Sequence, residues 1–86
     1  MDVEGVARLL KSERVAVMDG SLRAIGMSEK DARKLFEALR SIAGDGSVGY
    51  VTFKDFSVVF KLGNRSIAAI VPRDRINWCV AKIREL

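Results

Sequence analysis

The hydrophobic residues of this chain follow two repeating patterns, a helical one with a period of about 3.6 residues and a strand-like one with a period of about two. The helical pattern predicts helices over residues 3–11, 28–43 and 74–86. The alternating pattern, rich in β-branched and aromatic residues, predicts strands over residues 14–18, 21–27, 48–53, 56–62 and 65–71. The elements therefore follow the order α-β-β-α-β-β-β-α within one domain, residues 1–86.

Residues that cap helices or favour turns mark the boundaries of these elements. Ser28 opens the clearest helix, because the four residues from Ser28 resemble a capping box, and Gly44 follows as a C-cap. Asp74 is expected to cap the last helix. Asp19-Gly20 lies between two strand-like runs, which predicts a tight hairpin. Hairpins join neighbouring strands in antiparallel order, so we expect an α+β fold with a five-stranded antiparallel sheet and helices on both faces.

Composition narrows the chemistry that the chain can perform. The sequence has no His and a single cysteine, Cys79, so it offers neither an intrachain disulfide nor a typical zinc site. The lack of His also removes the usual acid–base group at neutral pH. Cys79 lies on the apolar stripe of the last helix, and we interpret it as a core residue rather than a nucleophile. We therefore expect no enzymatic activity, no cofactor and no metal ion.

The cysteine content and the apolar runs also indicate where the protein works. An unpaired thiol fits a reducing, cytoplasmic environment. The longest apolar runs, such as residues 67–71, are far too short to span a bilayer, and the acidic start is unlike a signal peptide. The scarcity of amide side chains is weakly typical of thermophilic proteins.

Residues 44–55 resemble the calcium-binding loop of an EF-hand but lack its ligands. If Gly49 is the glycine of such a loop, its first ligand positions fall on Gly44, Gly46 and Val48, none of which has a carboxylate. The last position falls on Asp55 instead of the longer Glu. We therefore interpret this segment as a turn followed by a strand.

Two further features bear on the partners of this protein. Trp78 lies off the apolar stripe of the last helix, where it either covers an edge of the core or is an exposed anchor for a partner. The net charge of +4 is also compatible with binding of nucleic acid, although no run of like charges occurs. The basic residues that would serve this alternative function are Arg65, Arg73, Arg75, Lys82 and Arg84.

The strand expected at residues 48–53 carries the main functional prediction. It contains no Pro and no charged residue, so its free backbone groups could pair with the same strand of a second copy. The alternative is that a loop covers it. Pairing would also bring together the two copies of the helix at residues 28–43, whose polar flank includes Arg40. The predicted dimer interface consists of Phe36, Arg40, Val48, Tyr50 and Thr52.

The order of these motifs resembles the roadblock (dynein light chain) family of small dimeric domains. Residues Leu9 to Gly20 resemble the first helix and first hairpin of that family. Residues Phe56 to Val71, followed by Pro72-Arg73-Asp74, resemble its last hairpin and closing helix. Longin and profilin-like domains have similar layers and remain alternatives.

The roadblock resemblance implies a specific arrangement and role. It implies that the helix at residues 28–43 covers one face of the sheet and that the other two helices cover the opposite face. It also implies a homodimer through that helix and the third strand. The implied role is a non-enzymatic adaptor that scaffolds or regulates a small Ras-like GTPase or a protein complex.

Overall fold

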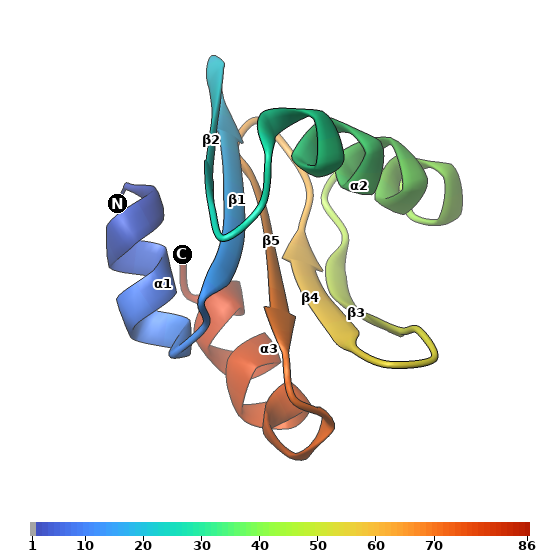
Figure 1. The fold of residues 1–86 in the computed structure, drawn as a ribbon. Helices are drawn as coiled ribbons and strands as arrows, with labels where there is room; N and C mark the ends of the chain where they lie inside the picture. Colours follow the sequence, from blue (N-terminus) through green and yellow to red (C-terminus); the bar gives the residue numbers. More distant parts are fainter. Residues whose placement is uncertain (1) are drawn as a thin grey trace.

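A five-stranded antiparallel sheet with three helices forms the molecule in the computed structural model, which describes residues 2–86 (Figure 1). The strands lie in the order β2-β1-β5-β4-β3, so β2 and β3 are the two edges. The helices are α1 (Val3–Leu10), α2 (Glu29–Ile42) and α3 (Ile76–Arg84), the last preceded by the short 3-10 helix η1 (Arg73–Arg75). The strands are β1 (Arg14–Asp19), β2 (Ser21–Ile25), β3 (Val48–Thr52), β4 (Ser57–Lys61) and β5 (Ser66–Val71). The predicted fold class and order of elements are confirmed.

Helix α2 covers one face of the sheet, as its apolar stripe predicts (Figure 1). Its side chains Ala32, Phe36 and Leu39 are fully buried. They pack against alternate residues of the strands, because every second strand residue points to the same face. These strand residues are Ala16, Leu22, Val58, Phe60 and Ala68. We call this layer the α2-face core.

Helices α1 and α3 cover the opposite face of the sheet (Figure 1). Val6 and Leu10 of α1 and Cys79 and Ile83 of α3 are fully buried there. The strand residues on this side are the alternates of those beneath α2, namely Val15, Val17, Val59, Ile67, Ala69 and Val71. The central strands β1, β4 and β5 are therefore apolar on both faces; β4 and β5 bury all but one side chain each, and β1 buries its three residues Val15–Val17.

Several boundaries follow the expected local chemistry. The Asp31 N–H donates to the Ser28 Oγ at 3.1 Å, so the predicted N-cap of α2 is confirmed. Gly20 has a φ of +75°, as the tight turn at Asp19-Gly20 requires. At the start of α1 the Gly5 N–H donates to an Asp2 carboxylate oxygen at 2.8 Å, which is the same kind of cap.

Two predicted helix ends are wrong. Asp74 lies inside η1 rather than at a cap, and no side chain caps either η1 or α3. Pro72 fixes an extended backbone just before this turn, so the chain tightens into a 3-10 turn before α3 begins. Helix α2 ends at Ile42 with Ala43 as its C-cap, one residue before the expected Gly44.

Among residues 2–86, none of the helices combines the length and the apolar character that crossing a membrane requires.

Candidate functional site

The backbone of β3 has a defined hydrogen-bonding direction at each residue. The Phe53 N–H donates to the Phe56 carbonyl at 2.8 Å, and the Leu62 N–H donates to the Ser47 carbonyl at 2.9 Å. Both bonds belong to the register in which β3 pairs with β4. Because an antiparallel ladder alternates strictly, the odd-numbered residues of β3 bond to β4 and the even-numbered ones point away from it. The N–H and C=O groups of Val48, Tyr50 and Thr52 therefore face outward.

Exposed apolar side chains occur on and next to β3 and at the end of α2. The large hydrophobic residues with high exposure include Ile42 at the end of α2 (62%), Tyr50 in β3 (55%) and Phe53 just after it (37%). The Phe53 ring stacks on Phe56 with centroids 4.9 Å apart. Half-buried Val51 fills the space toward α2.

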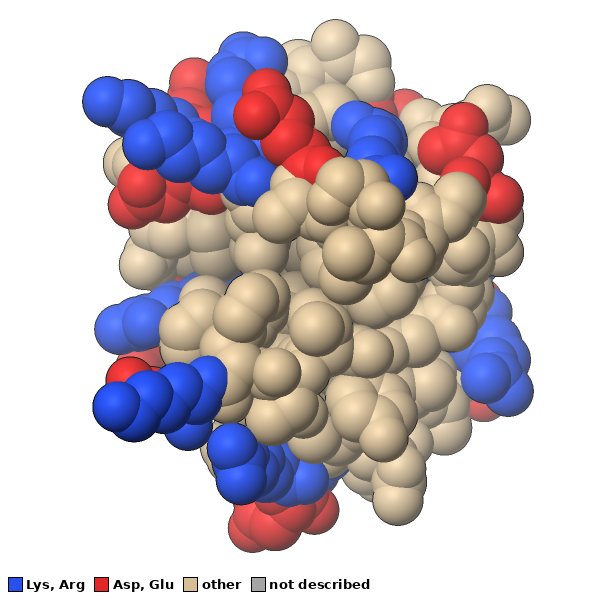
Figure 2. Space-filling model, turned by 90° about the vertical axis from the view of Figure 1, so that its right-hand side faces the viewer, with Lys and Arg blue, Asp and Glu red and all other residues tan. Residues whose placement is uncertain are grey.

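Charged side chains are kept to the margin of this side of the molecule. Figure 2 looks onto the side that carries β3 and the end of α2, and its centre consists of uncharged residues. The opposite edge strand, β2, differs because it contains the exposed residue Arg23. Charges on an edge strand discourage pairing with another strand, whereas an uncharged edge permits it. Of the two sheet edges, β3 is therefore the one suited to pairing.

The structure separates the predicted interface residues into three groups. Phe36 is fully buried between α2 and the sheet, so it offers no exposed surface to a second copy. Arg40 is exposed, but its guanidinium donates to the Ser66 Oγ at 3.0 Å within the same molecule. Val48, Tyr50 and Thr52 lie on the open edge as expected, with their backbone groups facing outward.

The side chains of Val48, Tyr50 and Thr52 point to the face opposite α2. Tyr50 is paired with Val59, which belongs to the core beneath α1 and α3. The residues of the edge that do lie on the α2 side are Val51 and Phe53, together with Ile42 of α2 itself. Sequence reasoning missed Ile42 as a surface residue because it continues the apolar stripe of α2.

Trp78 lies on the surface of α3 between two lysines. Its exposed fraction is 40%. The Lys11 Nζ and the Lys82 Nζ lie 5.7 and 5.8 Å from the ring centroid, within the range of a cation–π contact. A small depression of about 220 Å³ is lined by Trp78, Lys11 and Arg75. These contacts favour the interpretation of Trp78 as an exposed aromatic residue over the alternative that it covers an edge of the hydrophobic core.

A larger groove of about 490 Å³ adjoins this depression. It lies where the end of α1, the start of β1, the β3–β4 turn and the end of β5 meet, and we call it the basic groove. Five cationic residues line it against two acidic ones, Glu13 and Asp55. The cationic residues are Lys11, Arg14, Lys54, Arg73 and Arg75.

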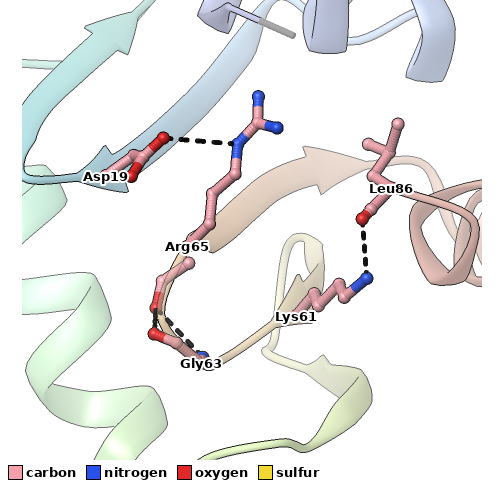
Figure 3. Close-up of polar contacts among 6 residues, drawn as sticks. Asp19, Lys61, Gly63, Arg65 and Leu86 are labelled. Atoms are coloured by element: carbon pink, nitrogen blue, oxygen red, sulfur yellow. Dashed lines mark hydrogen bonds and ion pairs between the residues drawn. The ribbon is translucent and has the colours of Figure 1, made fainter.

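The residues predicted for nucleic-acid binding are brought together only in part. Arg73 and Arg75 line the basic groove, and Lys82 contacts Trp78. Arg65 does not line the groove, because it follows the β4–β5 turn and its Nε lies 4.0 Å from an Asp19 carboxylate oxygen (Figure 3). Arg84 is exposed near the end of α3 and does not line the groove either.

Cys79 is the one thiol of the sequence, and the structure places it in the core. It is fully buried, and its Sγ donates to the Leu10 carbonyl at 3.7 Å. Burial raises the pKa of the Cys79 thiol, and the nearby Arg75 opposes that shift. The expectation of a core residue is confirmed. Within residues 2–86 no cluster of three or more His, Cys, Asp or Glu side chains is arranged to hold a metal ion.

Comparison with known proteins adds a distant archaeal relative. A protein of Archaeoglobus fulgidus, described only as uncharacterized, is 26% identical over 88 aligned positions. The alignment covers the whole of this chain and 96% of the relative. No family model and no solved structure matches the chain. The comparisons therefore show similarity to one archaeal protein of nearly the same extent.

Proposed function

We propose that this protein is a non-enzymatic interaction module that forms a homodimer by pairing the β3 edges of two copies. The observation that carries the proposal is the open edge of β3, with outward backbone groups at Val48, Tyr50 and Thr52 and no charged residue within the strand. The role of the dimer is that of an adaptor. Its partner, as the roadblock resemblance suggests, is a small Ras-like GTPase or a protein complex.

The proposed pairing has a definite register. In an antiparallel pair of identical strands related by a two-fold axis, the central residue lies opposite its own copy. Tyr50 is the middle residue of β3, so it would lie on the axis, with Val48 opposite Thr52 of the second copy. All three residues point their backbone groups outward and would therefore form the hydrogen bonds. The two sheets would join into one continuous sheet.

The surrounding side chains are compatible with this arrangement. Ile42, Val51 and Phe53 lie on the α2 side of the edge, and the exposed Tyr50 ring lies on the other side. Edge pairing would cover apolar surface on both faces at once, which provides a hydrophobic contribution beyond the backbone bonds. The net charge of +4 opposes association of two copies in general, but few charges lie near the centre of this contact.

The substitution Tyr50→Pro tests the proposed pairing. Proline removes the outward N–H at position 50 and leaves the bonds between β3 and β4 in place, since those involve the odd-numbered residues. The preceding residue is Gly49, which tolerates the backbone restriction that proline imposes. We expect wild type to sediment as a dimer at micromolar concentration and Tyr50→Pro to sediment as a folded monomer.

Tyr50→Val is the matched control for this variant. Valine removes the same ring, keeps the N–H and favours strands, so we expect dimerisation that is retained or only weakened. Circular dichroism checks that both variants are folded. A wild-type protein that stays monomeric at high concentration, or a Tyr50→Pro variant that stays dimeric, would contradict the proposal.

A further inference from the structure

We propose that the basic groove and Trp78 together bind single-stranded nucleic acid, with phosphates along the groove and a base stacked on the indole ring. This inference goes beyond the proposed dimer and does not depend on it, because the groove includes none of Ile42, Tyr50, Val51 and Phe53. Lys11 and Arg75 line both the groove and the depression at Trp78, so the two form one continuous surface.

The charge of the groove is largely uncompensated. Five cationic residues face two carboxylates there. In the part of the chain that the structure describes, the ion pair found joins Arg65 and Asp19, outside the groove. The lining therefore keeps an excess of positive charge, which would attract an anionic ligand.

Two of the guanidinium groups are held in place by main-chain carbonyls. The Arg73 Nη2 donates to the Phe53 and Lys54 carbonyls at 3.3 and 3.4 Å. The Arg75 Nη2 donates to the Lys11 carbonyl at 2.6 Å. These bonds fix the position of each group but leave its full positive charge, because a carbonyl is neutral. Both arginines also keep further N–H donors for a phosphate.

The exposed tryptophan distinguishes between kinds of anionic ligand. An acidic peptide would complement the cations, but its repeating unit offers no ring for the indole. Each nucleotide carries a negative phosphate and a flat aromatic base. The base could stack on the Trp78 ring while the phosphate contacts the ammonium groups beside it. A groove lined by five cations can contact several phosphates, so it fits a strand better than a single nucleotide. A base within a duplex is already stacked and paired, so a single strand is required.

Trp78 is the only tryptophan in the sequence, so its fluorescence reports directly on this site. Titration with a short oligothymidylate or oligouridylate at low salt should quench it in a saturable way, and added salt should weaken binding steeply. A duplex of equal length and a polyglutamate of equal charge serve as comparison ligands, and both should bind at least about tenfold more weakly than the single strand. Absence of saturable quenching by the single strand, or equal affinity for polyglutamate, would overturn the proposal.

Two pairs of lysine substitutions distinguish binding at the basic groove from nonspecific attraction to the net positive charge of the protein. Lys11→Gln with Lys54→Gln removes two cations of the groove, and Lys30→Gln with Lys34→Gln removes two exposed cations of α2. With a labelled single-stranded oligonucleotide, we expect the first pair to weaken binding about tenfold or more and to lower the salt slope by about 1.4. The second pair should change affinity less than about twofold. Equal losses in the two pairs would contradict a defined site.

Replacement of the ring tests the stacking contribution. Trp78→Ala should weaken binding of the labelled single strand about tenfold and leave the salt slope unchanged, since no phosphate contact is lost. Trp78→Phe should restore part of the affinity. The same titrations in Tyr50→Pro should give the same affinity as wild type per chain, which distinguishes failure of this site from failure of the dimer. A Trp78→Ala variant that binds as tightly as wild type would exclude the ring from the site.

Discussion

Phe36→Ala is expected to destabilise the folded protomer by about 3–5 kcal/mol. The Phe36 side chain is fully buried and packs in the α2-face core between the helix and the sheet. Its truncation would remove the apolar contacts of the ring and leave a cavity that the rigid sheet cannot fill by relaxation. The net stability of a small domain is about 5–15 kcal/mol, so the loss is a large part of the total. Chemical denaturation followed by circular dichroism measures it.

Ile42→Ala is the matched control on the same helix. Ile42 is 62% exposed, so its truncation should change the free energy of unfolding by no more than about 0.5 kcal/mol. Both variants are best compared in the Tyr50→Pro background, where dimerisation should not contribute to stability. If Phe36→Ala instead weakened self-association and left protomer stability intact, Phe36 would be an interface residue after all.

Gly26→Ala is the second substitution with a large expected effect, about 3 kcal/mol of lost stability. Gly26 has a φ of +73°, a conformation that side chains with a Cβ rarely adopt. An added Cβ would also overlap the Glu13 carbonyl and come within 3.1 Å of the Arg14 side chain. The backbone of both segments would have to move. Thermal unfolding should therefore show a much lower midpoint.

Substitutions at two other glycines distinguish the cost of a positive φ from the cost of the steric overlap with Glu13. Gly20 has a φ of +75° with no atom near the position of a Cβ, so Gly20→Ala should cost only about 1–2 kcal/mol. Gly44 has neither a positive φ nor a close neighbour, and Gly44→Ala should change stability by less than about 0.5 kcal/mol. Equal effects at Gly26 and Gly20 would show that the contact with Glu13 is unimportant.

The sequence predicts the helices and strands well because caps, turns and hydrophobic periodicity depend on residues that are close together in the chain. The Ser28 cap, the Asp19-Gly20 turn and the apolar period of α2 all depend on residues a few positions apart. The end of α2 and the start of α3 were displaced by a residue or two. At the latter, the backbone after Pro72 forms a 3-10 turn that the polar residue Asp74 does not reveal.

The candidate sites depend on contacts between segments that are distant in the sequence. Hydrophobic periodicity and secondary-structure propensity do not specify such contacts. The alternation of β3 puts Val48, Tyr50 and Thr52 on one face, but only the register with β4 decides that this face is opposite α2. The stripe of α2 identifies a buried side, but it does not show that Ile42, at the end of that stripe, is exposed.

The basic groove was missed for the same reason. Its cations come from the end of α1, the β3–β4 turn and η1, and the bond from Arg75 to the Lys11 carbonyl joins residues 64 positions apart. No single stretch of sequence is strongly basic. The predicted set therefore included Arg65 and Arg84, which lie elsewhere, and lacked Lys11, Arg14 and Lys54.

Amide hydrogen exchange of β3, followed by NMR at several protein concentrations, tests the proposed pairing most directly. The N–H groups of Gly49 and Val51 bond to β4, so they should be protected at every concentration. The N–H groups of Val48, Tyr50 and Thr52 should be protected at high concentration and exchange faster on dilution, as the dimer dissociates. Fast exchange of these three amides at all concentrations would contradict the account.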